Sequence, residues 1–141
     1  MEAENEIILR LDELIKQQNE TLKRLSTLNK PVFVQDGDKK KVLRISEIAF
    51  ITTNPKGLDI FTLDGNKHIN FDSISDMAEE FGNSEELMKT HKSFIVNLNS
   101  IASVQVVPGG RELRFKGLSP DITAKVTSDS LAEFEKRFGK F

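Results

Sequence analysis

The chain has 141 residues, a hydrophobic content of 38% and a net charge of −2, which fit one modest globular domain with an appended segment. It contains no cysteine, which excludes disulfides and thiolate chemistry and fits the reducing cytoplasm that we expect as its location. No segment is long and apolar enough to cross a bilayer, so we expect no membrane insertion. Because 20 basic residues are balanced by 22 acidic ones, contact with a polyanion requires a local patch of cations.

Residues 1–30 are predicted to form an amphipathic helix that ends at Pro31. Apolar residues occupy the a and d positions of a heptad repeat, namely Ile8, Leu11, Ile15, Leu22 and Leu25. This pattern predicts a coiled coil that joins two copies in a homodimer. One alternative is a helix folded back on its own domain, and the pattern also leaves open whether the helix pairs with itself or with another protein.

Residues 32–141 are predicted to form a mainly β domain with short helices, because short apolar runs alternate with turn signals. The basic run Lys39–Lys41 is typical of an exposed loop. Apolar spacing predicts one helix over residues 74–81 and a last helix over residues 131–138, capped by Thr127 or Ser128. Residues 84–87 are expected to add one more helical turn.

The stretch Met88–Ile101 begins polar and basic, continues as the β-type run Phe94-Ile95-Val96, and ends at Asn97-Leu98-Asn99. One interpretation is a core strand with a solvated entry. The other is a rigid strand whose donor-rich tip, His91 to Ser93, meets an anionic partner. Residue spacing alone does not decide between the two.

Catalytic motifs are absent from the sequence. His68 and His91 are the only histidines, and no metal-binding histidine pair, phosphate-binding glycine loop or nucleophile elbow is present. We therefore expect neither an enzyme nor a bound metal or cofactor.

The phrase His91-Lys92-Ser93-Phe94-Ile95-Val96-Asn97-Leu98, with Ile101 shortly after it, resembles the signature of the LytTR DNA-binding domain of bacterial transcription regulators. The resemblance extends from Val42 to Phe138. It implies a stack of small antiparallel sheets that inserts loops, and not a recognition helix, into the major groove of double-stranded DNA.

On this resemblance, DNA contacts are expected at three places. They are the loop with Asn54 and Lys56, the tip with His91 and Lys92, and the junction with Ser128. The sequence departs from the family at two of them. Lys92 stands where arginine is frequent and lacks the bidentate guanidinium fork. Ser128 replaces an arginine, for which Lys125 is a candidate substitute.

These features predict a sequence-specific transcription regulator that lacks a receiver domain and binds DNA as a homodimer. The near-neutral charge and Ser128 support the alternative of a LytTR-fold interaction module with reduced or lost DNA binding. A regulatory protein partner is compatible with either function.

Overall fold

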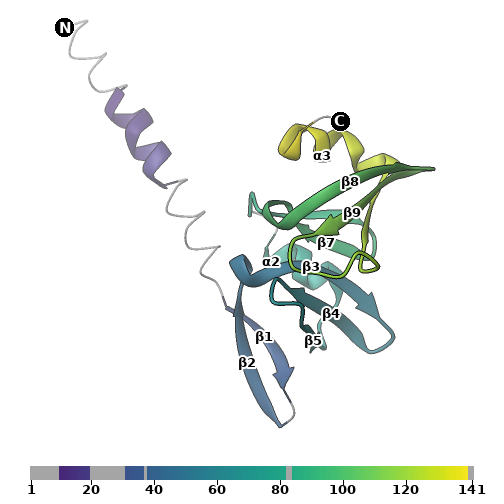
Figure 1. The fold of residues 1–141 in the computed structure, drawn as a ribbon. Helices are drawn as coiled ribbons and strands as arrows, with labels where there is room; N and C mark the ends of the chain where they lie inside the picture. Colours follow the sequence, from purple (N-terminus) through teal and green to yellow (C-terminus); the bar gives the residue numbers. More distant parts are fainter. Residues whose placement is uncertain (1–9, 20–30, 37, 82–83, 140–141) are drawn as a thin grey trace, which may run out of the picture.

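The structure is a computed structural model, and it describes residues 10–19, 31–36, 38–81 and 84–139. Two antiparallel sheets form the body, a seven-stranded sheet in the order β2-β1-β5-β4-β3-β7-β6 and a three-stranded sheet in the order β10-β9-β8 (Figure 1). The strands are β1 (Pro31–Asp36), β2 (Lys39–Arg44), β3 (Ile48–Asn54), β4 (Gly57–Thr62), β5 (Lys67–Asn70), β6 (Leu87–His91), β7 (Phe94–Asn97), β8 (Ile101–Val107), β9 (Gly110–Phe115) and β10 (Ala124–Thr127). The helices of the body are α2 (Ile74–Glu80) and α3 (Leu131–Phe138).

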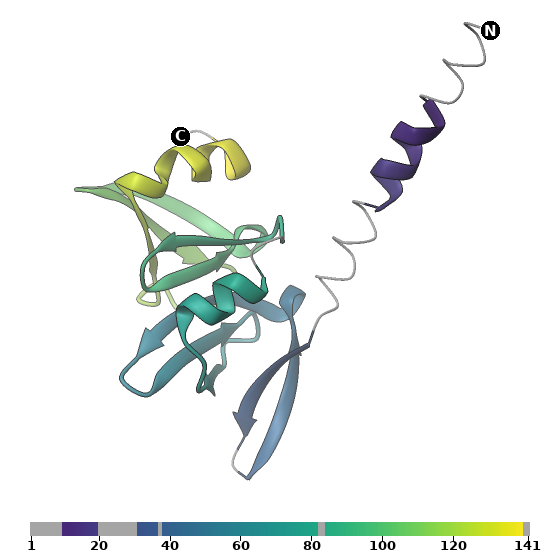
Figure 2. The same cartoon turned by 180° about the vertical axis from the view of Figure 1, so that it is seen from behind.

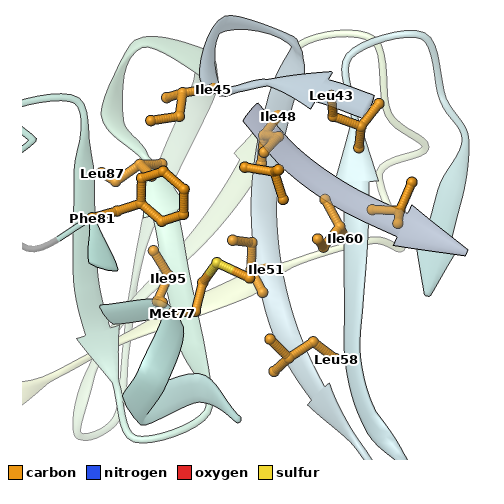
Figure 3. Packing of buried hydrophobic residues seen from close by; sticks show 12 residues of the cluster. Leu43, Ile45, Ile48, Ile51, Leu58, Ile60, Met77, Phe81, Leu87 and Ile95 are labelled. Carbon is orange, nitrogen blue, oxygen red and sulfur yellow. The ribbon is translucent and has the colours of Figure 1, made fainter. Parts of the chain in front are cut away.

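The first hydrophobic core lies between the large sheet and α2. Met77 of α2 is buried against strand residues that include Ile51, Ile60 and Ile95, and Figure 3 shows these side chains converging. Ser73 begins the helix, because its hydroxyl oxygen accepts a 3.1 Å hydrogen bond from the Asp76 backbone N–H. Burial of side chains of this size stabilises the fold by about 1.5–3 kcal/mol each.

The second core joins the two sheets and α3. Phe50 of β3 stacks between Phe61 and Phe115, with ring centroids 4.7 Å apart in both pairs. Phe134 of α3 is fully buried in the same cluster. Aromatic pairs add about 0.5–1.5 kcal/mol beyond the area that they bury, so Phe50 links the large sheet firmly to the small one.

Residues 10–19 are helical, as the heptad pattern predicts, and every residue of this helix is exposed. Leu11, Leu14 and Ile15 are 52–55% exposed, and Figures 1 and 2 show the helix standing apart from the β body. Ile8, Leu22 and Leu25 lie outside the described residues. Among the helices that the structure describes, none has the length and apolar character required to cross a membrane.

The mainly β fold class is confirmed, whereas three local predictions are wrong. Lys39–Lys41 is not a loop, because it forms the start of β2 and pairs with β1. Residues 84–87 are not helical, and β6 begins at Leu87. The N-cap residue of α3 is Ser130, since Thr127 ends β10 and a short 3₁₀ turn separates the two elements.

Candidate nucleic-acid interface

The tips of three hairpins lie on the same side of the molecule. They are the β3–β4 turn, the β6–β7 turn, and the β8–β9 turn with the adjacent end of β10. Both views show them along one edge, at the right in Figure 1 and at the left in Figure 2. We call this surface, residues 53–57, 90–93, 107–111 and 125–128, the loop edge.

The β3–β4 and β6–β7 tips are adjacent within the large sheet. Thr52 pairs with Phe94 across strands β3 and β7. Beyond this pair, the Thr53 backbone N–H donates a 3.2 Å hydrogen bond to the Ser93 carbonyl. The predicted contact residues Lys56 and Lys92 are therefore carried by neighbouring turns of one sheet.

Thr90 joins the β6–β7 tip to the small sheet. This side chain is fully buried, and its hydroxyl donates a 2.8 Å hydrogen bond to the Lys125 carbonyl. In return, the Thr127 hydroxyl donates to the Thr90 carbonyl at 3.4 Å. The Ser128 backbone N–H then donates to the Gly109 carbonyl at 3.0 Å. This chain of bonds connects the three predicted contact regions into one continuous edge.

Asn54 organises its own turn. Its side-chain amide donates a 2.9 Å hydrogen bond to Asp59, and its side-chain oxygen accepts a 2.7 Å bond from the Lys56 backbone N–H. Such an Asx turn fixes the backbone of the loop. The Lys56 side chain is exposed at the tip, so Lys56 presents charge while Asn54 holds its position.

The His91 ring has a defined hydrogen-bonding pattern. Its Nδ1 accepts a 3.0 Å hydrogen bond from the Ser93 backbone N–H, and its edge packs on Phe94 with a centroid distance of 5.3 Å. In a neutral ring with Nδ1 as acceptor, the proton lies on Nε2, which then serves as a donor. His91 is partly exposed and the next residue, Lys92, is exposed. The tip therefore offers the Nε2 donor of His91 beside a cation.

Lys125 and Ser128 are both exposed, but they differ in position. Ser128 lies directly at the tip, next to Gly109. Lys125 is set back along β10, opposite Glu112 of β9. Because Thr127 and Gly110 pair at the tip, the Lys125–Glu112 pair lies farther from it, at the flank of the loop edge. The Glu112 carboxylate also forms a 3.1 Å salt bridge with Arg114.

Arg111 is a cation of the loop edge that the sequence analysis did not identify. It pairs with Val126 of β10, and its Nη1 donates a 2.9 Å hydrogen bond to the Gly110 carbonyl. In the described part of the chain, its Nε is buried without a hydrogen-bond partner. In sequence, Arg111 is indistinguishable from any hairpin arginine, because only the pairing of β9 with β10 brings it to this edge.

Asn97 and Ser100, in and beside the signature phrase, are buried and structural. The Asn97 amide donates to the Ile48 carbonyl at 2.8 Å, and the Ser100 hydroxyl donates to the Ala49 carbonyl at 3.0 Å. These bonds hold the end of β7 against the start of β3. They fix the base of the hairpin whose tip carries His91 and Lys92.

The family model of the LytTr DNA-binding domain matches residues 38–139 of the chain. The chain belongs to the LytTR DNA-binding domain family. Comparison with curated proteins gave no match. Among solved structures, the chain is similar to the LytTr DNA-binding domain of a Bacillus cereus protein named as a methyl-accepting/DNA response regulator. The TM-score is 0.65 at 16% identity, over 79% of this chain and 99% of that one, a likeness that supports the LytTR fold.

The described residues contain no group of three or more His, Cys, Asp or Glu side chains that could hold a metal ion. The chemistry of the LytTR loop edge is that of hydrogen-bond donors and cations. Lys56, Lys92 and Arg111 supply positive charge, and His91 and Ser128 supply further hydrogen-bond donors. This is the set of groups that contacts phosphate oxygens and the acceptor atoms of base edges.

Proposed function

We propose that this LytTR domain binds double-stranded DNA in a sequence-specific way through the loop edge, with the tips entering the major groove, and thereby regulates transcription. The observation that carries the proposal is the joining of three turns by the Thr53–Ser93 and Thr90–Lys125 hydrogen bonds. A fixed spacing between tips allows base contacts in one turn to be combined with phosphate contacts in another.

Different tips are proposed to contact different parts of the DNA. Lys92 and His91 lie on a hairpin anchored at its base by Asn97, so they are the best-positioned side chains for reading bases. Lys56, Arg111 and Lys125 are proposed to contact phosphates, because such contacts require positive charge and position the protein without reading sequence. Asn54 and Thr90 are proposed as positioning residues.

Selection of binding sites from a random duplex library, at low and high salt, tests this function. We expect a defined sequence to be enriched at both salt concentrations, with an affinity that falls as salt rises because cations of the protein displace counterions from DNA. Enrichment of no sequence, with weak binding to all duplexes, would reduce the function to non-specific DNA binding.

A second candidate function is a protein-interaction module without DNA binding. Ser128 supports it, because this exposed tip position carries no charge where the family commonly has arginine. Absence of binding to any duplex at low salt would favour this module over the DNA-binding regulator.

We further propose that the chain is a homodimer held by the stripe of Ile8, Leu11, Ile15, Leu22 and Leu25. The described helix supports this proposal, because Leu11 and Ile15 are 52% and 55% exposed in a single copy. Pairing two such helices removes both stripes from water.

A further inference from the structure

The outer face of β1, β2 and β5 carries an exposed apolar cluster. Phe33, Val42, Ile69 and Phe71 are 53%, 44%, 43% and 65% exposed. Phe33 pairs with Val42, and Gln35 pairs with Ile69, so side chains from all three strands share this face. The opposite face of β1 contributes Val32 and Val34 to the first core. The cluster is therefore separate from the core, and it is exposed in a single copy.

The cluster borders a groove of about 290 Å³, which we call the outer groove. Its walls include Phe33 and Lys40 on one side and Ile69, Phe71 and Asp72 on the other. Asn70 fixes the two sides together, because its amide donates to the Phe33 carbonyl at 2.6 Å and its side-chain oxygen accepts from the Asp72 N–H at 2.7 Å. Asn70 is only 8% exposed. The groove is thus a preformed feature of the fold.

The strands around the groove are positively charged, although the whole chain is not. By the alternation of side chains along a strand, Lys40 and Arg44 of β2 and Lys67 of β5 lie on the same face as Phe33, Val42 and Ile69, and the groove wall adds the carboxylate of Asp72, a net of +2. The whole chain carries −2. Such a local excess of positive charge selects an anionic partner.

The combination of positive charge and exposed apolar side chains further limits the class of partner that fits the groove. A second copy of this face would bring like charges together, which is unfavourable. Duplex DNA would place phosphates against Phe33 and Phe71, whose rings gain nothing from that contact. A peptide with both carboxylates and apolar side chains satisfies the cations and covers the rings.

We propose that the outer groove binds an acidic, apolar-containing segment of a partner protein. Apolar side chains of the segment pack on Phe33, Ile69 and Phe71, and its carboxylates meet Lys40 and the other cations of the same face. This inference goes beyond DNA binding and does not depend on it, because the groove is built by β1, β2 and β5 and not by the tips of the loop edge.

The test uses synthetic peptides and the full chain. Isotope-labelled protein is titrated with a 14-residue peptide of alternating glutamate and leucine or phenylalanine, and with a matched peptide in which lysine replaces every glutamate. We expect saturable changes in the amide resonances of Phe33, Lys40 and Phe71 with the acidic peptide. The basic peptide should bind at least tenfold more weakly.

Three variants sharpen the test. Phe33→Ser combined with Phe71→Ser should abolish binding of the acidic peptide. Val106→Ser, which removes an apolar side chain that is 67% exposed on β8, should leave binding unchanged. Lys40→Glu should weaken the acidic peptide and strengthen the basic one. All these side chains are exposed, so the fold should tolerate the changes, and the amide spectrum verifies this.

Several results would overturn the proposal. These are no saturable binding, equal binding of both peptides, or resonance changes centred away from the groove. Displacement of the probe by anionic vesicles would assign the groove to a membrane surface, and displacement by duplex DNA would assign it to nucleic acid. Groove resonances that shift with protein concentration alone would indicate a second copy. Tighter binding of a peptide of residues 1–19 would indicate the chain's own N-terminal segment.

Discussion

At the scale of single residues, position in the hairpin distinguishes groups that present chemistry from groups that hold them in place. Lys92 is exposed at the β6–β7 tip, whereas Asn97 is buried at the base of the same hairpin and donates to the Ile48 carbonyl at 2.8 Å. Because a buried backbone carbonyl needs a donor, the hydrogen bond from Asn97 stabilises the base of the hairpin. The two residues are close in sequence and opposite in role.

Lys92→Ala tests the role of the tip. If Lys92 reads a base, affinity for the preferred site should fall by about 1–3 kcal/mol and selectivity at that base pair should relax. If it contacts phosphate, all duplexes should bind more weakly and the salt slope should fall by about one. Fluorescence anisotropy on matched and mismatched duplexes distinguishes the two.

Lys116→Ala is the matched control, because Lys116 is exposed at the end of β9 opposite to the loop edge. It removes the same charge from the chain. Equal losses for Lys92→Ala and Lys116→Ala would show that only net charge matters, and would remove the case for a specific contact at the tip.

Asp64 illustrates how a turn residue links stability to pH. Hydrogen bonds from the Thr62 hydroxyl and then from the Asn66 backbone N–H lower the pKa of this carboxyl below its usual value. A lowered pKa in the folded state means that ionised Asp64 contributes stability above the ordinary aspartate pKa of about 3.9. That contribution is lost as the pH falls through the folded-state pKa.

Asp64→Asn should therefore be less stable than the parent chain at neutral pH, and the difference should shrink below a pH of about 3.9. Urea unfolding at a series of pH values measures it. A difference that stays constant down to the lowest pH would show that the hydrogen bonds do not favour the ionised form.

At the scale of elements, the small sheet depends on a close approach between β9 and β10. A Cβ atom added to Gly110 would lie 1.8 Å from the Val126 carbonyl oxygen, which no side-chain movement can relieve. Gly109, the preceding residue, has a φ of +83° but no atom within 4 Å of an added Cβ. The two glycines are therefore required for different reasons.

Gly110→Ala should lower the free energy of unfolding by at least about 2 kcal/mol, in the upper part of the range for point mutations, because the β10 backbone must move away. Gly109→Ala should cost about 1–2 kcal/mol, the penalty for a left-handed conformation without a clash. Urea denaturation of both variants gives the comparison. A larger loss for Gly109→Ala would show that backbone strain, and not strand contact, governs this turn.

Local patterns explain which elements the sequence could predict. The turn at Asn54–Gly57 and the cap at Ser73 depend on residues only a few positions apart, and both are found in the structure. The wrong prediction for Lys39–Lys41 also came from a local pattern. A lysine run is typical of loops, but pairing with β1 makes it a strand. Tertiary pairing overrides the local preference there.

The connections within the loop edge lay beyond sequence reasoning, because they join residues far apart in the chain. Thr90 meets Lys125 across 35 positions. Arg111 reaches the edge only through the register of β9 and β10. The signature phrase contains the β6–β7 turn, but it carried no information on which buried threonine ties that turn to the second sheet.

At the scale of the whole molecule, the domain has its proposed surfaces on different elements. The loop edge is formed by hairpin tips, and the outer groove lies on β1, β2 and β5. The two surfaces approach each other at one point, where a Cβ atom on Gly57 would lie 2.9 Å from the Phe71 Cα. A segment bound in the groove at Phe71 would thus lie next to the turn that carries Lys56.

Assembly is tested by Ile15→Asp, which would place a charge in the proposed helix seam. Because an unpaired buried charge is strongly unfavourable, sedimentation should shift from dimer to monomer. Gln17→Asp makes the same charge change at an outer position of the same heptad, and should remain a dimer. A parent chain that already sediments as a monomer would contradict the coiled coil.

Dimerisation should in turn determine how the chain uses DNA. Two LytTR domains joined by a helix pair convert the second half-site contact into an intramolecular step, with a gain in overall affinity of about 10²–10⁴. A two-fold helix pair favours inverted half-sites if the domains follow its symmetry. Three test duplexes are therefore compared: one with two inverted half-sites, one with two direct half-sites, and one with a single half-site. We expect the parent chain to prefer the better two-site duplex by at least about a hundredfold. The Ile15→Asp variant should bind the one-site duplex with the affinity of the parent chain and lose the preference for two-site duplexes. An equal preference in both proteins would show that the domains assemble on DNA without the helix.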